Sequence, residues 1–158
     1  MAIEIERKFL TLDQRWRSEI VRSVHMRQAY LGGEGVSIRV RVAGELATIN
    51  IKENRLGFKR QEFEYPIPLQ DALDLAELSN GGEIVKTRHY VRHDGLTWEI
   101  DEFEGHNEGL VVAEVELDSE NRELNLPFWI DREVTDEERY YNVTLAKKPY
   151  RLWREDEG

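Results

Sequence analysis

The sequence predicts an α+β fold in which an antiparallel sheet closes into an eight-stranded β-barrel with flanking helices. Three observations lead to this prediction. Apolar and polar residues alternate with a period of two in many short segments, as they do in strands with one buried face. The polar faces carry pairs of like charges, and these pairs segregate by strand, basic in some segments and acidic in others. The opposite faces are apolar and include Phe and Trp, so other elements must cover them.

The chain opens with such a segment, EIERKFL. Glu4, Glu6 and Lys8 fall on one face of the expected strand, and Ile5 and Phe9 fall on the other. The same pattern recurs along the chain, and strands are expected at 4–10, 37–42, 48–52, 60–65, 85–92, 97–101 and 112–117.

Four segments are expected to be helical, at 12–22, 69–78, 119–125 and 135–148. In the first, Leu12, Trp16 and Ile20 lie along one helical stripe. The second follows Pro66 and Pro68, which prevent a helix from continuing upstream.

The other two helices are predicted from their N-terminal signals. Ser119 is a suitable N-cap and is followed by acidic residues in the first turn. Thr135 and Glu138 have the spacing of a capping box. No repeat or low-complexity linker interrupts the chain, so we expect a single domain over 1–158, with a frayed acidic tail at 153–158.

Composition excludes several classes of function. The 158 residues are enough to bury a substantial core, and the formal net charge of −10 argues against non-specific binding to nucleic acid or to an anionic membrane. There is no membrane-spanning apolar run and no signal-peptide pattern. The absence of Cys excludes disulfides and thiolate metal sites and fits a cytoplasmic protein.

The charged faces allow two interpretations. In the first, they simply meet solvent, which is usual for antiparallel sheets. In the second, they line the inside of a closed barrel, where water, metal ions or a charged ligand must compensate them. Segregation of charge by strand favours the second interpretation, because like charges two residues apart repel each other. A phosphate chain carrying divalent metal ions would satisfy both the basic and the acidic groups.

At this point the motifs resemble those of a known family. EIERKF resembles the ExExK signature of the CYTH superfamily, the triphosphate tunnel metalloenzymes, and the match is closest to the short bacterial tripolyphosphatases. The resemblance continues in order through SIRVR, TINIK, RQEFEY, VKTRHY, WEIDEFEG and VAEVEL, and it ends in DREVTDEERYYNVTLA. It implies the same closed barrel that the alternation predicts.

The resemblance also implies roles for individual residues. Metal ligands on the triphosphate would be Glu4, Glu6, Glu114 and Glu116, with Asp101 and the adjacent Glu99 at a second, catalytic metal. Basic residues that grip phosphate oxygens would be Lys8, Arg39, Arg41, Lys52, Arg60 and Arg88. Glu62 and Glu64 would pair with these basic residues, and Lys86 would be the general base. Lys147, in the terminal KKPYR segment, is left out, since a cation at a helix C-terminus is equally expected on a solvated surface.

The expected reaction is hydrolysis of a linear triphosphate, most simply inorganic tripolyphosphate, with Mg²⁺ or Mn²⁺ as cofactor. Like charges around Lys86 should lower its pKa and make a neutral amine available. Alternatives are a class IV adenylyl cyclase, a thiamine triphosphatase, or a non-catalytic module that binds polyphosphate or nucleotides. We expect a small anionic substrate as the partner, no nucleic acid or membrane, and a monomer or homodimer.

Overall fold

The computed structural model of the protein describes residues 3–79 and 82–153. Its strands are β1 (Ile3–Thr11), β2 (Ile20–Gly32), β3 (Val36–Ala43), β4 (Leu46–Glu53), β5 (Lys59–Pro66), β6 (Glu83–His93), β7 (Leu96–Phe103), β8 (Val111–Glu116) and β9 (Ile130–Glu133). Its α-helices are α1 (Leu69–Glu77) and α2 (Asn142–Lys147). Short 3₁₀ helices span Arg15–Glu19, Gly105–Asn107, Glu138–Tyr140 and Tyr150–Leu152.

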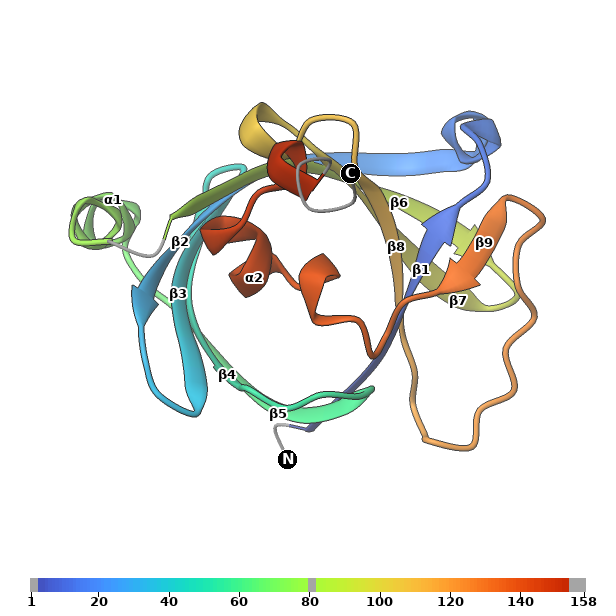
Figure 1. Ribbon diagram of the computed structural model, residues 1–158, viewed down its shortest axis with the longest axis horizontal. Coiled ribbons are helices and arrows are strands. Elements are labelled where there is room, and N and C mark those ends of the chain that lie inside the picture. Colours follow the sequence, from blue (N-terminus) through green and yellow to red (C-terminus); the bar gives the residue numbers. More distant parts are fainter. Residues whose placement is uncertain (1–2, 80–81, 154–158) are drawn as a thin grey trace.

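The strands close into an antiparallel barrel (Figure 1). The order is β5-β4-β3-β2-β6-β7-β8-β1, and the ring closes because β1 pairs with both β8 and β5. β9 adds to the far end of β1, where Thr11 lies opposite Ile130. The predicted eight-stranded barrel is therefore confirmed, and closure leaves no open edge among these eight strands.

The eighth strand of the barrel is β2, which lies where the sequence predicts the end of a helix. The predicted helix at 12–22 is wrong: only Arg15–Glu19 forms a 3₁₀ turn, and Ile20 already begins β2. The stripe was misleading because Leu12 is 57% exposed, whereas Trp16 is fully buried against the outer wall of the barrel, next to His89.

The predicted C-terminal helices are also largely wrong. No helix forms at 119–125, and the segment 135–148 is broken into a 3₁₀ turn and the short α2. Thr135 does not cap a helix; its hydroxyl accepts a hydrogen bond from the backbone N–H of Lys8 at 3.0 Å. The helix predicted at 69–78 is confirmed as α1.

The hydrophobic core forms three clusters, two outside the barrel wall and one on its inner face. One gathers Phe9, Trp98 and Trp129 beneath the 3₁₀ turn and the segment that leads to β9. A second gathers Tyr30, Ile84, Phe103, Leu145 and Trp153, and a third packs Ala72 of α1 against Ala29, Val40 and Ala47. In the first and third clusters the apolar faces of the strands point outward, which leaves their charged faces for the lumen. In the second cluster α2 packs against the inner face of the barrel, since Ile84 lies on the same face of β6 as Lys86.

Two further features bear on the predictions. Trp153, placed by the sequence in a frayed tail, is 7% exposed and packs on Tyr140 and Tyr150. The rest of that tail, 154–158, lies outside the described residues. α2 lies within the outline of the ring rather than on its flank (Figure 1). Within the described part of the chain, no helix is long and apolar enough to cross a membrane.

Candidate active site

The lumen holds a cavity of about 330 Å³ that we call the charged cavity. Thirteen of the fifteen residues predicted for the site line it: Glu4, Glu6, Lys8, Arg39, Arg41, Lys52, Glu62, Glu64, Lys86, Arg88, Glu99, Glu114 and Glu116. The other two lie elsewhere. Arg60 lines a neighbouring cavity, and Asp101 is fully buried in the wall.

Strand register brings residues from distant parts of the sequence face to face. Lys8 of β1 lies opposite Glu114 of β8, and its Nζ is 2.6 Å from Glu114 Oε1. Burial acts to lower the pKa of Lys8, but the charges of Glu114 and Glu6 outweigh it and raise the pKa. Lys8 therefore stays protonated in the lumen.

A buried network surrounds Lys86. Its Nζ donates to Asp101 Oδ2 at 2.7 Å and to Asn142 Oδ1 at 2.9 Å. Arg88 also donates to Asp101, from Nε to Oδ1 at 2.7 Å and from Nη2 to Oδ2 at 2.9 Å. Both oxygens of Asp101 are thus occupied by cations, and a metal ion could reach this carboxylate only if Lys86 or Arg88 moved away.

The pKa of Lys86 is lowered to about 7. Burial is the largest cause, because it disfavours the charged amine; Arg88 and Arg41 lower the pKa further, while Asp101 opposes them. The sequence predicts this direction from like charges alone, whereas the larger cause is burial.

Acidic groups crowd the opposite part of the charged cavity. Burial, the charge of Glu6 and a hydrogen bond to Glu62 together raise the pKa of Glu4 to about 9, with burial the largest cause. Burial opposes a low pKa for Glu62, but its hydrogen bond with Glu4 and the charge of Lys52 lower it. Burial beside Glu6 and Glu62 raises the pKa of Glu116. These carboxyl groups repel one another, and a bound cation would relieve the repulsion.

The donor chemistry fits Mg²⁺ or Mn²⁺, which take oxygen ligands. No three carboxylate or imidazole groups are already gathered around one point in the described chain. Such an arrangement is compatible with Mg²⁺, which is commonly held by one or two carboxylates while water and substrate phosphates complete the shell. Glu4, Glu6 and Glu116 are the residues that would hold the ion, because Glu114 is engaged by Lys8 and Arg88.

Two arginines in the charged cavity remain available for an anion. Arg41 forms no ion pair with any residue in the described ranges; its Nε donates to Gln28 Oε1 at 2.7 Å. Burial, and after it the charges of Arg39 and Arg88, lower the pKa of Arg41 to about 10. Arg39 meets only a distant carboxylate, with Nη2 3.8 Å from Glu62 Oε1. A phosphate group would accept hydrogen bonds from both guanidinium groups and neutralise their charge.

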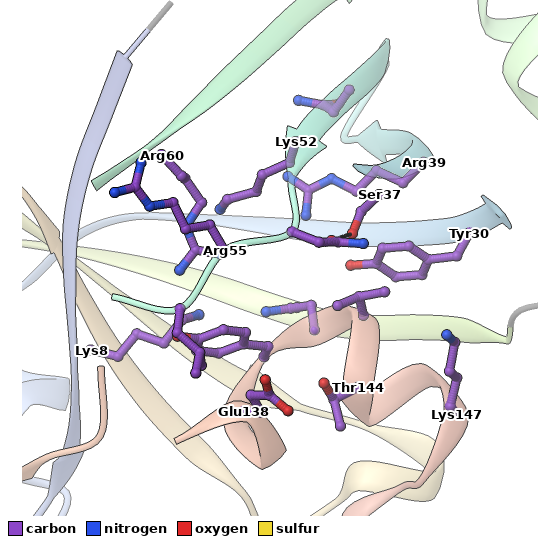
Figure 2. A pocket seen from close by; sticks show the side chains of 16 residues that line it. Lys8, Tyr30, Ser37, Arg39, Lys52, Arg55, Arg60, Glu138, Thr144 and Lys147 are labelled. Atoms are coloured by element: carbon purple, nitrogen blue, oxygen red, sulfur yellow. Dashed lines mark hydrogen bonds between the residues drawn. The ribbon is translucent and has the colours of Figure 1, made fainter. Parts of the chain in front are cut away.

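A second cavity of about 310 Å³ adjoins the first (Figure 2). We call it the basic cavity after the cations that line it: Lys8, Arg39, Lys52, Arg55, Arg60 and Lys147. Arg55 was not predicted, and Lys147 was left out of the predicted site. Neither could be placed from the sequence, because Arg55 lies in a loop and Lys147 at the end of a helix whose docking position sequence periodicity does not show.

Sequence reasoning also missed two polar residues that connect the site. Gln28 comes from β2, and its Nε2 donates to Asn142 Oδ1 at 3.2 Å. Asn142, at the start of α2, thereby joins Lys86 to Gln28, and Gln28 joins this network to Arg41. Gln28 lies in a stretch for which the sequence predicts no element, and Asn142 lies in a predicted helix that was not expected to face the lumen.

Comparison with known proteins gives one family match. The CYTH domain matches residues 2–150 of this chain. Two relatives named inorganic triphosphatase are similar over most of their length. The one from Acetivibrio thermocellus is 41% identical over 157 residues, covering 98% of this chain and 100% of the relative. The one from Nitrosomonas europaea is 34% identical over 148 residues, covering 90% and 96%.

Solved structures agree with these matches. A crystal structure of an inorganic triphosphatase aligns with a TM-score of 0.69 at 33% identity, covering 94% of this chain and 97% of the other. A putative adenylyl cyclase from Hippeastrum, described as having dominant triphosphatase activity, aligns with a TM-score of 0.57 at 16% identity, covering 75% and 80%. At that identity the second alignment shows a shared fold alone.

Proposed function

The chain belongs to the family of CYTH-domain proteins, and we propose that it is an inorganic triphosphatase that hydrolyses tripolyphosphate to pyrophosphate and phosphate. The observation that carries the proposal is the charged cavity, in which six basic and seven acidic side chains face one space. A receptor for a simple anion gains nothing from the carboxylates. A triphosphate that carries divalent metal ions uses both sets.

Phosphoryl transfer depends mainly on positioning and on charge stabilisation. Arg39 and Arg41 offer guanidinium groups that match phosphate oxygens in pairs, and Lys8 and Lys52 add point charges. Arg88 would bind a phosphate oxygen only by giving up a contact with Asp101 or Glu99. Arg60 reaches the substrate only if the phosphate chain extends into the basic cavity. Glu62 and Glu64 accept hydrogen bonds from Asn50, and Glu62 also pairs with Arg39 and Lys52.

Metal dependence is a general property of this family, and we propose Mg²⁺ or Mn²⁺ for this member. Bound by Glu4, Glu6 and Glu116, the ion would neutralise phosphate oxygens and lower the pKa of a bound water. We propose that Glu99, Glu114 and Asp101 hold cationic side chains rather than the metal ion. Glu99 and Asp101 hold Arg88, with Glu99 Oε2 2.7 Å from its Nη1, and Glu114 holds Lys8.

Lys86 is proposed as the base that takes a proton from the attacking water. It lines the charged cavity, and Asp101 and Asn142 fix the position of its amine. The water oxygen attacks the terminal phosphorus, its proton passes to the amine, and the bond to the bridging oxygen breaks, which releases pyrophosphate.

The test is a product analysis on three substrates: tripolyphosphate, ATP and thiamine triphosphate, each with Mg²⁺, with Mn²⁺ and with a chelator. We expect orthophosphate chiefly from tripolyphosphate, and only when a metal ion is present. Cyclic AMP and pyrophosphate from ATP would identify a cyclase instead. Preferred turnover of thiamine triphosphate would identify a thiamine triphosphatase, and tight binding without turnover would identify a receptor.

Three features stay predictions from the sequence: a cytoplasmic location, a monomeric or homodimeric state, and the absence of nucleic-acid and membrane partners. The formal net charge of −10 supports the last of these. Size-exclusion chromatography with light scattering measures the oligomeric state directly.

A further inference from the structure

We propose that the basic cavity is a second anion site, which binds a phosphate group without a metal ion. The site adjoins the charged cavity but differs from it in composition. The inference rests on the proposed function only in its choice of phosphate as the ligand.

The charge balance of the basic cavity separates it from the charged cavity. Six cationic side chains line it, and Glu138 is the one carboxylate among its described lining residues. Glu138 is exposed, and the six cations around the cavity repel a divalent ion. An anion in this cavity must therefore be bound by the cations directly.

Several of these cations lack a neutralising partner. Neither Arg60 nor Lys147 forms an ion pair with a residue that the structure describes. The Nη2 of Arg60 donates to the carbonyl of Gly57 at 2.9 Å, and its guanidinium lies over the ring of Tyr141. Arg55 reaches only Glu53, with Nη1 3.6 Å from Oε1, and its side chain is 64% exposed. Like charges that share one small space repel one another, and an anion would remove the repulsion.

The arrangement of donors suits a tetrahedral oxyanion. Figure 2 shows Arg55, Arg60 and Lys52 extending from the β4–β5 side into the same space, with Lys147 of α2 at the other end. The hydroxyl group of Thr144 adds a neutral donor to the lining, whereas the hydroxyl of Ser37 donates to Asn54 Oδ1. Charge-assisted hydrogen bonds from guanidinium and ammonium groups to phosphate are among the stronger ones in proteins.

The two cavities are connected by shared walls. Lys8, Arg39, Lys52 and Asn142 line both. A phosphate group could enter the basic cavity in two ways: as free orthophosphate released by hydrolysis, or as the end of a linear phosphate chain longer than three units. The chemistry of binding is the same in both cases.

The test measures binding of orthophosphate to the full chain by calorimetry, with a chelator present. The double variant Arg55→Ala/Lys147→Ala removes two cations that are not assigned to catalysis. The matched control is Arg27→Ala/Lys148→Ala, which removes the same charges from exposed positions outside the cavity. We expect at least about a 10-fold weaker affinity in the first variant and less than about a 2-fold change in the control.

A second arm uses linear tetraphosphate under the same metal-free conditions. Weaker binding of orthophosphate in the double variant supports the site with free phosphate as its source. Weaker binding of tetraphosphate alone supports the site with a chain end as its source. Unchanged binding of both ligands overturns the proposal, as does phosphate binding that is lost in Arg41→Ala but kept in the double variant, since that anion would lie in the charged cavity.

Failure of this inference can be told apart from failure of the proposed function. Turnover of tripolyphosphate with Mg²⁺ is measured on the same proteins. Absence of turnover in the unmodified protein contradicts the triphosphatase assignment. Normal turnover combined with unchanged phosphate binding in the double variant contradicts only the second anion site.

Discussion

Buried charges in the lumen are held by specific partners rather than by solvent. Lys86 and Asp101 are both fully buried, and each is tied to the other and to a further side chain. Removing one member of such a group leaves a partner uncompensated, which typically costs about 3–5 kcal/mol. A substitution at Lys86 must therefore be judged on stability as well as on catalysis.

At Lys86 we predict that substitution by Met removes the base but keeps much of the volume. The kcat for tripolyphosphate should fall by about 10²-fold or more, with KM changed much less, because a positioned base contributes to the transition state. The measurement is steady-state kinetics on protein whose folding is checked by circular dichroism. A folded variant with the original kcat and normal metal affinity would show that Lys86 is not the base.

At Glu6 we predict a loss of metal affinity. Glu6→Gln keeps the shape of the side chain but removes a negative charge from the acidic part of the charged cavity. Affinity for Mn²⁺, followed by its paramagnetic resonance signal, should fall at least about 10-fold. Glu77→Gln on the exposed face of α1 is the control and should bind Mn²⁺ as the original protein does. Equal affinity for Mn²⁺ in the two variants would show that Glu6 does not bind the metal ion.

Among the elements, α2 depends on a close approach to the start of β6. Gly82 has φ +89°, and a Cβ at this position would lie 2.2 Å from the carbonyl oxygen of Ala146 in α2. Only glycine allows this contact. Since α2 carries Asn142 and Lys147, the contact sets the position of residues in both cavities.

Gly82→Ala should therefore lower the free energy of unfolding by about 2 kcal/mol or more and should also reduce turnover. Gly95→Ala is the matched control: it has φ +74° and nothing within 4 Å of the added Cβ, so it tests backbone strain without the clash. Its cost should be about 1 kcal/mol, with turnover unchanged. Urea denaturation and kinetics on both variants measure the difference, and equal losses in the two would show that the clash is unimportant.

The attachment of β9 to β1 depends partly on a surface ion pair. Arg7 Nη2 lies 2.6 Å from Glu133 Oε1, and the hydrogen bond from Arg7 lowers the pKa of Glu133. A lowered pKa in the folded state means that the pair stabilises the fold above the unfolded pKa and loses this effect as pH falls through the folded pKa.

Glu133→Gln should thus destabilise the protein by about 0.5–1 kcal/mol near neutral pH, as is usual for an exposed pair. The difference from the original protein should shrink at acid pH, as the pH falls below the unfolded pKa of Glu133 and then through its lowered folded pKa. Thermal unfolding at neutral and at acid pH measures this. A difference that stays constant with pH would mean that the ion pair contributes nothing.

The elements also show what could be predicted from sequence. Alternation located seven of the barrel strands and thirteen residues of the charged cavity, because a strand's faces follow directly from its residue order. β2 was missed because its first residue continues the apparent helical stripe of Leu12 and Trp16. Asn142, Gln28 and Arg55 were missed because their positions depend on how distant segments dock, which no local period encodes.

For the whole molecule, closure of the barrel is the feature on which function depends. It places β1 between β5 and β8, so that Glu4 comes within 3.0 Å of Lys52 while Lys8 comes within 2.6 Å of Glu114. Two clusters of the core lie outside the wall and a third packs α2 against the inner face, and the charges that would destabilise an ordinary core are collected in the rest of the lumen. A ligand that carries both phosphate and metal charges compensates them together.

The most direct test of this account is a ³¹P NMR time course of tripolyphosphate with the protein and Mg²⁺. One orthophosphate and one pyrophosphate should appear for each tripolyphosphate consumed, and a chelator should stop the reaction. Tripolyphosphate that remains intact with Mg²⁺ or Mn²⁺ present, or hydrolysis that continues unchanged with the chelator, would contradict the account.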